Sequence, residues 1–132
     1  MTGTTDPTSR ERKSLGEFGE RVAAAHLEAR GYEIIERNFR VYEAEIDIVA
    51  RHGRTLVFVE VRTRRGGPEG MAAASVNQRK AAQLRRAVDW YIERHPECAD
   101  DLMRIDVITV ELAADGTLRR LAHIEDAVHG DR

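Results

Sequence analysis

The sequence predicts an α/β domain in which helices flank a mixed β-sheet, in the order α-β-β-β-α-β-β. Helical apolar spacing appears twice, over about residues 15–30 and 75–94, and the remaining segments are rich in β-branched residues bounded by turn signals. The succession strand–helix–strand between residues 55 and 110 requires a crossover, which gives parallel strands with a right-handed connection. At 132 residues, the chain has the length of one domain.

The first expected helix follows a polar segment. Residues 1–14 contain no apolar stretch, so we expect a disordered tail there and no secretory signal. From Leu15 onward apolar side chains recur at three- and four-residue spacing, and Gly31 is suited to end the helix in the left-handed conformation. Apolar residues within residues 32–40 then indicate a first strand.

A hairpin and a crossover helix complete the order. Residues 45–51 and 55–63 read as strands joined by a tight turn at His52-Gly53-Arg54. The second of them is apolar on both faces, so we expect it in the centre of the sheet. A loop over residues 64–70, a helix over residues 75–94, and strands over residues 105–110 and 118–124 follow. The domain is therefore expected to span residues 15–126, with a second tail over residues 127–132.

Composition excludes several classes of protein. With 21 Lys and Arg against 23 Asp and Glu, the net charge of -2 gives no global basic field. The single cysteine, Cys98, excludes an internal disulfide and fits a reducing compartment, so we expect a cytoplasmic protein. No apolar run approaches the ~20 residues of a membrane span, and the five histidines lack zinc-ligand spacing. Aromatic residues are scarce, so no base-stacking platform is expected.

Two strand carboxylates stand where a half-buried strand normally places apolar side chains. Residues two apart share a face, so Glu60 lies beside Arg62, and pairing of the two strands would bring Asp47 to both. Burying two carboxylates is unfavourable unless a cation neutralises them. Mg²⁺ or Mn²⁺ with oxygen ligands satisfies this requirement. Glu45 shares a face with Asp47, and either pairs with a surface arginine or joins the metal ligands.

Four ordered blocks carry a family resemblance: residues 16–20 (GEFGE), 45–50 (EIDIVA), 58–62 (FVEVR) and 104–108 (RIDVI). Together they resemble the YraN-like endonuclease-related family of small bacterial proteins, in the PD-(D/E)xK, restriction-endonuclease-like superfamily. The similarity runs from about Leu15 to Val110 and implies a restriction-endonuclease-like fold with a Mg²⁺-dependent nuclease site. In that site Asp47, Glu60 and the Val61 carbonyl would hold Mg²⁺ or Mn²⁺, and Glu20 would add a carboxylate from the first helix.

Arg62 departs from the family pattern, which has lysine there. Arginine stays protonated and cannot act as a base, although its planar fork suits a phosphate. Lys80 would supply the missing ammonium, and with Gln78 it opens the second helix, where a similar polar pair supports phosphate or water in some relatives. Asp106, in the last block, is expected to pair with a neighbouring basic side chain.

The expected partner is nucleic acid, with DNA as the first class and branched or single-stranded DNA as the substrates considered. Basic residues that flank the acidic site would contact phosphates. Together with the polar Gln78, the predicted nucleic-acid-binding residues are Arg62, Arg64, Arg65, Gln78, Arg79 and Lys80. Three interpretations compete with a nuclease: a non-catalytic nucleic-acid-binding module, a protein-interaction module, and a scaffold whose charges are only solvated. Divalent-metal binding separates the nuclease from these interpretations, and salt-sensitive DNA binding without cleavage favours the nucleic-acid-binding module over the scaffold.

Overall fold

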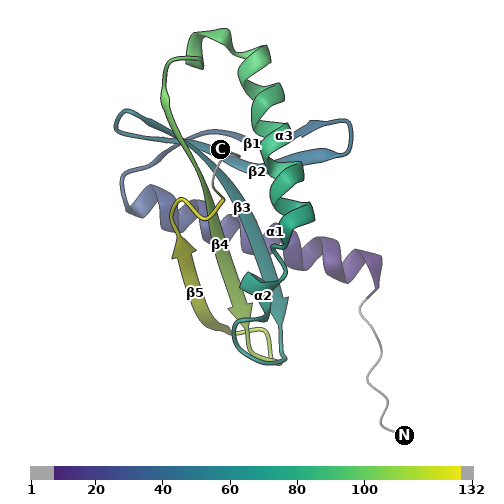
Figure 1. Ribbon diagram of the computed structural model, residues 1–132. Coiled ribbons are helices and arrows are strands. Elements are labelled where there is room, and N and C mark those ends of the chain that lie inside the picture. The colour runs from purple at the N-terminus through teal and green to yellow at the C-terminus, as the bar shows by residue number, and fades with distance from the viewer. Residues whose placement is uncertain (1–7, 129–132) are drawn as a thin grey trace, which may run out of the picture.

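The computed structural model describes residues 8–128, which form one mixed five-stranded sheet with helices on both faces (Figure 1). The strand order is β1-β2-β3-β4-β5, and only β3 and β4 pair in parallel. The strands are β1 (Glu33–Val41), β2 (Ala44–His52), β3 (Thr55–Arg65), β4 (Leu102–Leu112) and β5 (Leu118–Ile124). The expected mixed sheet and the central place of the third strand are confirmed.

Helix α1 (Ser9–Ala29) begins six residues before the expected start at residue 15. The Thr8 hydroxyl accepts a hydrogen bond from the Glu11 N–H at 3.1 Å and so caps the helix. The expectation of a disordered tail is therefore wrong for residues 9–14, while residues 1–7 lie outside the described residues. Gly31, with a φ of 89°, follows the helix end as expected.

Two short helical segments were not predicted. Helix α2 (Met71–Ala74) follows the glycine-rich loop, and η1 (Pro96–Cys98) follows the main crossover helix. That crossover helix, α3 (Gln78–Arg94), begins three residues later than expected, because the Asn77 side chain accepts the Lys80 N–H at 2.9 Å and caps it there. Within residues 8–128, no helix combines the length and apolar character that crossing a membrane requires.

The domain extends past residue 126. The Ala127 N–H donates to the Ile105 carbonyl at 2.8 Å, and Val128 is buried in the core at 6% exposure. The expectation of a tail is therefore wrong for these two residues, because an apolar side chain at position 128 closes the layer under α3. Residues 129–132 lie outside the described residues.

Apolar layers cover both faces of the sheet. The layer under α1 includes Ala23, Leu27, Ile48, Val57, Val59 and Ile108. The layer under α3 includes Phe39, Ile46, Val49, Phe58, Leu84 and Tyr91. Helix α1 packs so closely on β3 at Gly19 that a β-carbon there would collide with the Thr63 hydroxyl. This close approach brings the next residue, Glu20, to the sheet.

Candidate functional site

Asp47 lies where β2 separates from β3. The ladder between these strands ends at the pair Ile48–Val59, one residue before Asp47 and Glu60 would face each other. Beyond that point the Val61 N–H donates instead to the Asp47 carboxylate at 2.8 Å. The carboxylate thus takes the place of a ladder carbonyl, and the backbone of β3 fixes its position. In an extended strand the N–H and C=O of one residue face the same neighbour, so the Val61 carbonyl is directed to this side as well.

Glu60 is buried on the α3 side of β3, with 2% exposure, and two cations contact it. Its Oε2 accepts a hydrogen bond from Arg62 Nη1 at 3.1 Å and lies 3.4 Å from Lys80 Nζ. Arg62 Nε also donates to the Ser75 hydroxyl at 2.7 Å, and that hydroxyl donates to the Ala72 carbonyl. The segment from α2 to the first turn of α3 therefore holds both cations against one carboxylate.

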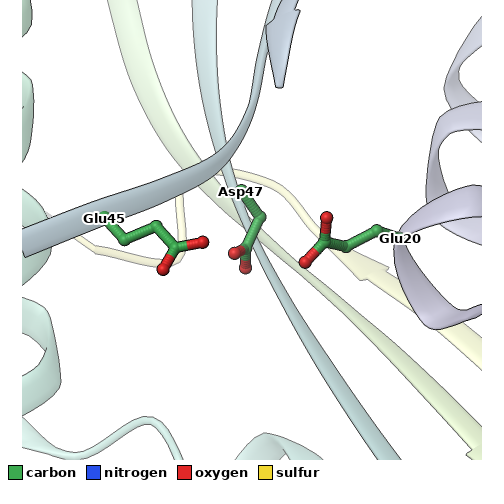
Figure 2. A group of neighbouring side chains, drawn as sticks. All are labelled: Glu20, Glu45 and Asp47. Atoms are coloured by element: carbon green, nitrogen blue, oxygen red, sulfur yellow. The ribbon is translucent and has the colours of Figure 1, made fainter. Parts of the chain in front are cut away.

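Two further carboxylates, those of Glu20 and Glu45, lie close to Asp47. Oxygens of Glu20, Glu45 and Asp47 lie within 4.8 Å of one another, and their side chains point toward a common centre (Figure 2). Glu20 comes from α1, whereas the other two come from β2. Asp47 also interacts with Glu60 of β3, which links this group of three carboxylates to a fourth.

The pKa of Asp47 is shifted by its surroundings. Its pKa is raised to about 8, first by burial and then by the charge of Glu60, with a smaller contribution from Glu20. The Val61 N–H opposes the shift, because it stabilises the ionised form. Burial likewise raises the pKa of Glu20, against the nearby Arg37. Without a cation, Asp47 therefore keeps its proton to a higher pH than an ordinary aspartate does.

Each of the two outer carboxylates has an arginine partner on β1. Arg37 Nη2 lies 3.7 Å from Glu20 Oε1, and Arg40 Nε lies 3.4 Å from Glu45 Oε2. Glu45 thus pairs with a surface arginine, the first role left open by the sequence, and it also lies in the carboxylate group, while its role as a metal ligand stays a prediction. These pairs are partly exposed and worth about 0–1 kcal/mol, so they do not remove the carboxylates from use by a ligand.

The remaining predicted residues are divided between the site and its surroundings. Arg64 is exposed on the β3 face that carries Glu60 and Arg62, and Gln78 and Arg79 are exposed on the first turn of α3 beside Lys80. Arg65 projects from the opposite face of β3, where its Nε donates to the Ala114 carbonyl at 2.9 Å. The structure therefore does not bring Arg65 to the carboxylates.

Asp106 belongs to a separate structural network. It is fully buried and accepts hydrogen bonds from Arg104 Nε, His123 Nε2 and the Asp126 N–H at 2.8–2.9 Å. Burial opposes its ionisation, but the bonds from His123 and Arg104 outweigh burial and lower the pKa of Asp106. Pairing with basic side chains, as the sequence indicated, satisfies this charge.

Sequence reasoning missed three residues that shape the site. Ser75 orients Arg62, and Arg37 and Arg40 hold the outer carboxylates. No spacing signal identifies Ser75, because the loop before α3 determines its position. The register of β1 against β2, which pairs Arg40 with Glu45, would have identified the second arginine.

Comparison with known proteins places this site inside a shared region of sequence. The family model described as "Uncharacterised protein family UPF0102" matches residues 19–110, which include all four carboxylates. A UPF0102 protein of Frankia casuarinae is 46% identical over 118 residues, covering 89% of this chain and 98% of that protein. A UPF0102 protein of Parafrankia sp. is 50% identical over 112 residues, covering 83% and 92%. A third, from Roseiflexus castenholzii, is 44% identical over 117 residues, covering 89% and 94%.

Proposed function

The chain belongs to the uncharacterised protein family UPF0102, and we propose that it is a Mg²⁺- or Mn²⁺-dependent nuclease with a restriction-endonuclease-like site. The observation that carries the proposal is the position of Asp47. Its carboxylate is fixed by the Val61 N–H at 2.8 Å and lies between Glu20 and Glu45, and it also interacts with Glu60 (Figure 2). Carboxylates that could hold a metal ion lie there beside the basic side chains of Arg62 and Lys80, and hydrolysis of a phosphodiester uses both kinds of group.

The donor set fits a hard divalent cation. Four carboxylates and the Val61 carbonyl offer oxygen alone, which Mg²⁺ and Mn²⁺ prefer. The pKa of Asp47 is raised first by burial and then by the charge of Glu60, and a bound cation would offset both effects. Asp47, Glu60 and the Val61 carbonyl would hold the ion, with Glu20 and Glu45 beside them. Bound there, it would polarise a phosphate oxygen and lower the pKa of water.

The basic side chains suit the substrate phosphate. Arg62 is oriented by Ser75 and stays protonated, so it stabilises negative charge and cannot remove a proton from water. Lys80 Nζ lies 3.4 Å from the Glu60 carboxylate. Lys80 of α3 therefore supplies the ammonium that a lysine at position 62 would otherwise supply. Arg64 extends the positive edge along β3, and such contacts make binding to nucleic acid fall with salt.

Cleavage of branched, single-stranded and duplex DNA in Mn²⁺ or Mg²⁺ tests the proposal. Asp47→Asn should reduce cutting by about 100-fold or more, because it removes a carboxylate that would hold the cation at the reacting phosphate. Asp100→Asn is the matched control, since Asp100 is exposed and lies beyond η1, away from the carboxylates. Cutting that persists in Asp47→Asn would come from a contaminating nuclease and would contradict the proposal.

Arg62 supports a second function, a nucleic-acid-binding module that retains the fold without catalysis. The Arg62 side chain is held by Glu60 and Ser75, stays protonated and therefore cannot act as a base. In that case DNA binding is salt-sensitive, no cutting occurs, and Asp47→Asn leaves binding unchanged. A gain of cutting in Arg62→Lys would decide for a nuclease whose base had been weakened.

A further inference from the structure

An aromatic patch lies beside the carboxylate site, formed by Tyr42, Trp90 and Arg94. Tyr42 occupies the two-residue loop between β1 and β2 and is 84% exposed. Its ring meets Trp90 of α3 edge-on, with centroids 5.2 Å apart and an interplanar angle of 61°. The Arg94 guanidinium carbon lies 5.9 Å from the centre of the Trp90 ring. One tyrosine ring is thus held open to solvent beside a tryptophan and a cation.

The backbone at Tyr42 is unfavourable for this residue. Its φ of 54° lies in the left-handed region, which glycine and asparagine adopt more readily than a tyrosine does. Two-residue hairpin loops commonly carry glycine or asparagine for this reason. A strained residue that presents an exposed aromatic ring indicates a functional constraint.

The patch continues from the carboxylates along the same hairpin. Tyr42 lies three residues before Glu45, a span of at most about 11 Å along an extended chain. Helix α3 makes the same connection, because Lys80 in its first turn contacts Glu60 and Trp90 lies further along it. A strand with one phosphate at the carboxylates would therefore have neighbouring nucleotides at Tyr42.

We propose that Tyr42 and Trp90 form a stacking subsite for an unpaired base, with Arg94 beside it for the adjoining phosphate. This inference rests on the proposed function and narrows its substrate to nucleic acid with unpaired bases next to the cleaved bond. Every base has a π-face that stacks on an aromatic ring, whereas a closed duplex keeps those faces inside its own stack. The scarcity of aromatic residues argued against such a platform, but the fold gathers two of them at one place.

A protein partner is the weaker explanation. Tyrosine, tryptophan and arginine are also frequent at protein interfaces. A stable interface, however, needs about 800 Å² on each partner, far more than three side chains offer. Tyr42 also belongs to the hairpin that carries Glu45 and Asp47, whose carboxylates suit a cation better than an apolar interface.

Trp90 is the single tryptophan of the chain, so its fluorescence reports on the patch directly. The test titrates full-length Asp47→Asn, which does not cut, with a short oligothymidine or with a blunt duplex in Mg²⁺. We expect quenching by oligothymidine and little by the duplex. In this background Tyr42→Ala should weaken oligothymidine binding by about 5- to 100-fold, the loss expected for one base–aromatic stack, and leave duplex binding within about twofold.

Two further variants control for ring chemistry and for general surface effects. Tyr42→Phe keeps the ring and should bind oligothymidine as tyrosine does. Leu118→Ala removes another exposed apolar side chain, with 53% exposure, from β5 and should change nothing. Equal quenching by the duplex, a change below about twofold in Tyr42→Ala, or an equal loss in Tyr42→Phe overturns the subsite.

The subsite and the nuclease proposal fail in different ways. Binding of oligothymidine with quenching, but without cutting by the unaltered chain, refutes the nuclease and leaves the stacking subsite. Metal-dependent cutting with binding that is indifferent to Tyr42→Ala refutes the subsite and leaves the nuclease. Absence of any binding and any cutting refutes both.

Discussion

Replacing Asp47 with asparagine should stabilise the metal-free protein, and increasingly so as pH rises. The asparagine side chain keeps the size of aspartate, and its carbonyl accepts the same Val61 N–H. It places no titratable charge next to Glu60. The perturbation therefore removes an electrostatic penalty and retains the hydrogen bond.

The sign follows from the direction of the pKa shift. Asp47 ionises near pH 3.8 when unfolded, but its pKa in the folded protein is about 8. Between these values the folded state binds more protons than the unfolded state, so the free energy of unfolding falls as pH rises through this window. At about 1.4 kcal/mol for each pKa unit, the upper limit of the penalty is about 6 kcal/mol. Solvent reaches this partly buried carboxylate, so we expect a gain of about 1–3 kcal/mol at about pH 8 and none at about pH 4.

Urea unfolding of both proteins in EDTA, at several pH values between about 4 and 8, measures this difference. Asp100→Asn, which changes an exposed carboxylate, should give a difference that does not vary with pH. A gain for Asp47→Asn that is independent of pH would refute the raised pKa. A loss of stability near pH 8 would refute it as well.

Two further predictions concern the metal and the helix that carries Glu20. Mg²⁺ at about 100 times its dissociation constant should raise the free energy of unfolding by about 2.7 kcal/mol, measured by urea or thermal melts. Asp47→Asn should abolish this gain, whereas Glu28→Gln, an exposed change on α1, should keep it. Gly19→Ala should destabilise the protein by about 1–3 kcal/mol, because its β-carbon meets Thr63. Gly16→Ala, with nothing within 4 Å, should instead be neutral or stabilise α1 by up to about 1 kcal/mol, and equal losses in the two variants would contradict the close packing at Gly19.

The sheet could be predicted because its elements have clear periods. Val57 and Val59 lie under α1 while Leu56 and Phe58 lie under α3, so the two-sided apolar pattern of β3 identified the central strand. The same alternation placed Glu60 and Arg62 on one face. Such local patterns survive folding because neighbouring strands and helices impose the same burial on them.

The full carboxylate group could not be predicted, because it depends on an irregularity in β2. Strict alternation would place Ile46 and Ile48 on one face, yet the first packs under α3 and the second under α1. The strand therefore changes its orientation around Asp47, at the point where its ladder with β3 ends. Both positions are apolar, so the sequence does not reveal the change. Its consequence is that Asp47 faces Glu45 and Glu20 as well as Glu60.

Several locally unfavourable features lie together along the β1–β2 hairpin and its neighbours. Asp47 has a pKa of about 8, Glu60 is buried with two cations, and Tyr42 adopts a φ of 54°. Each of these three features lowers stability or requires specific partners. A purely structural role would favour asparagine at position 47 and glycine at position 42. A bound cation would neutralise the carboxylates, and a phosphate would engage Arg62 and Lys80. In the proposed function, one ligand, a nucleic-acid strand with its metal ion, would engage the carboxylates, the cations and the exposed ring together.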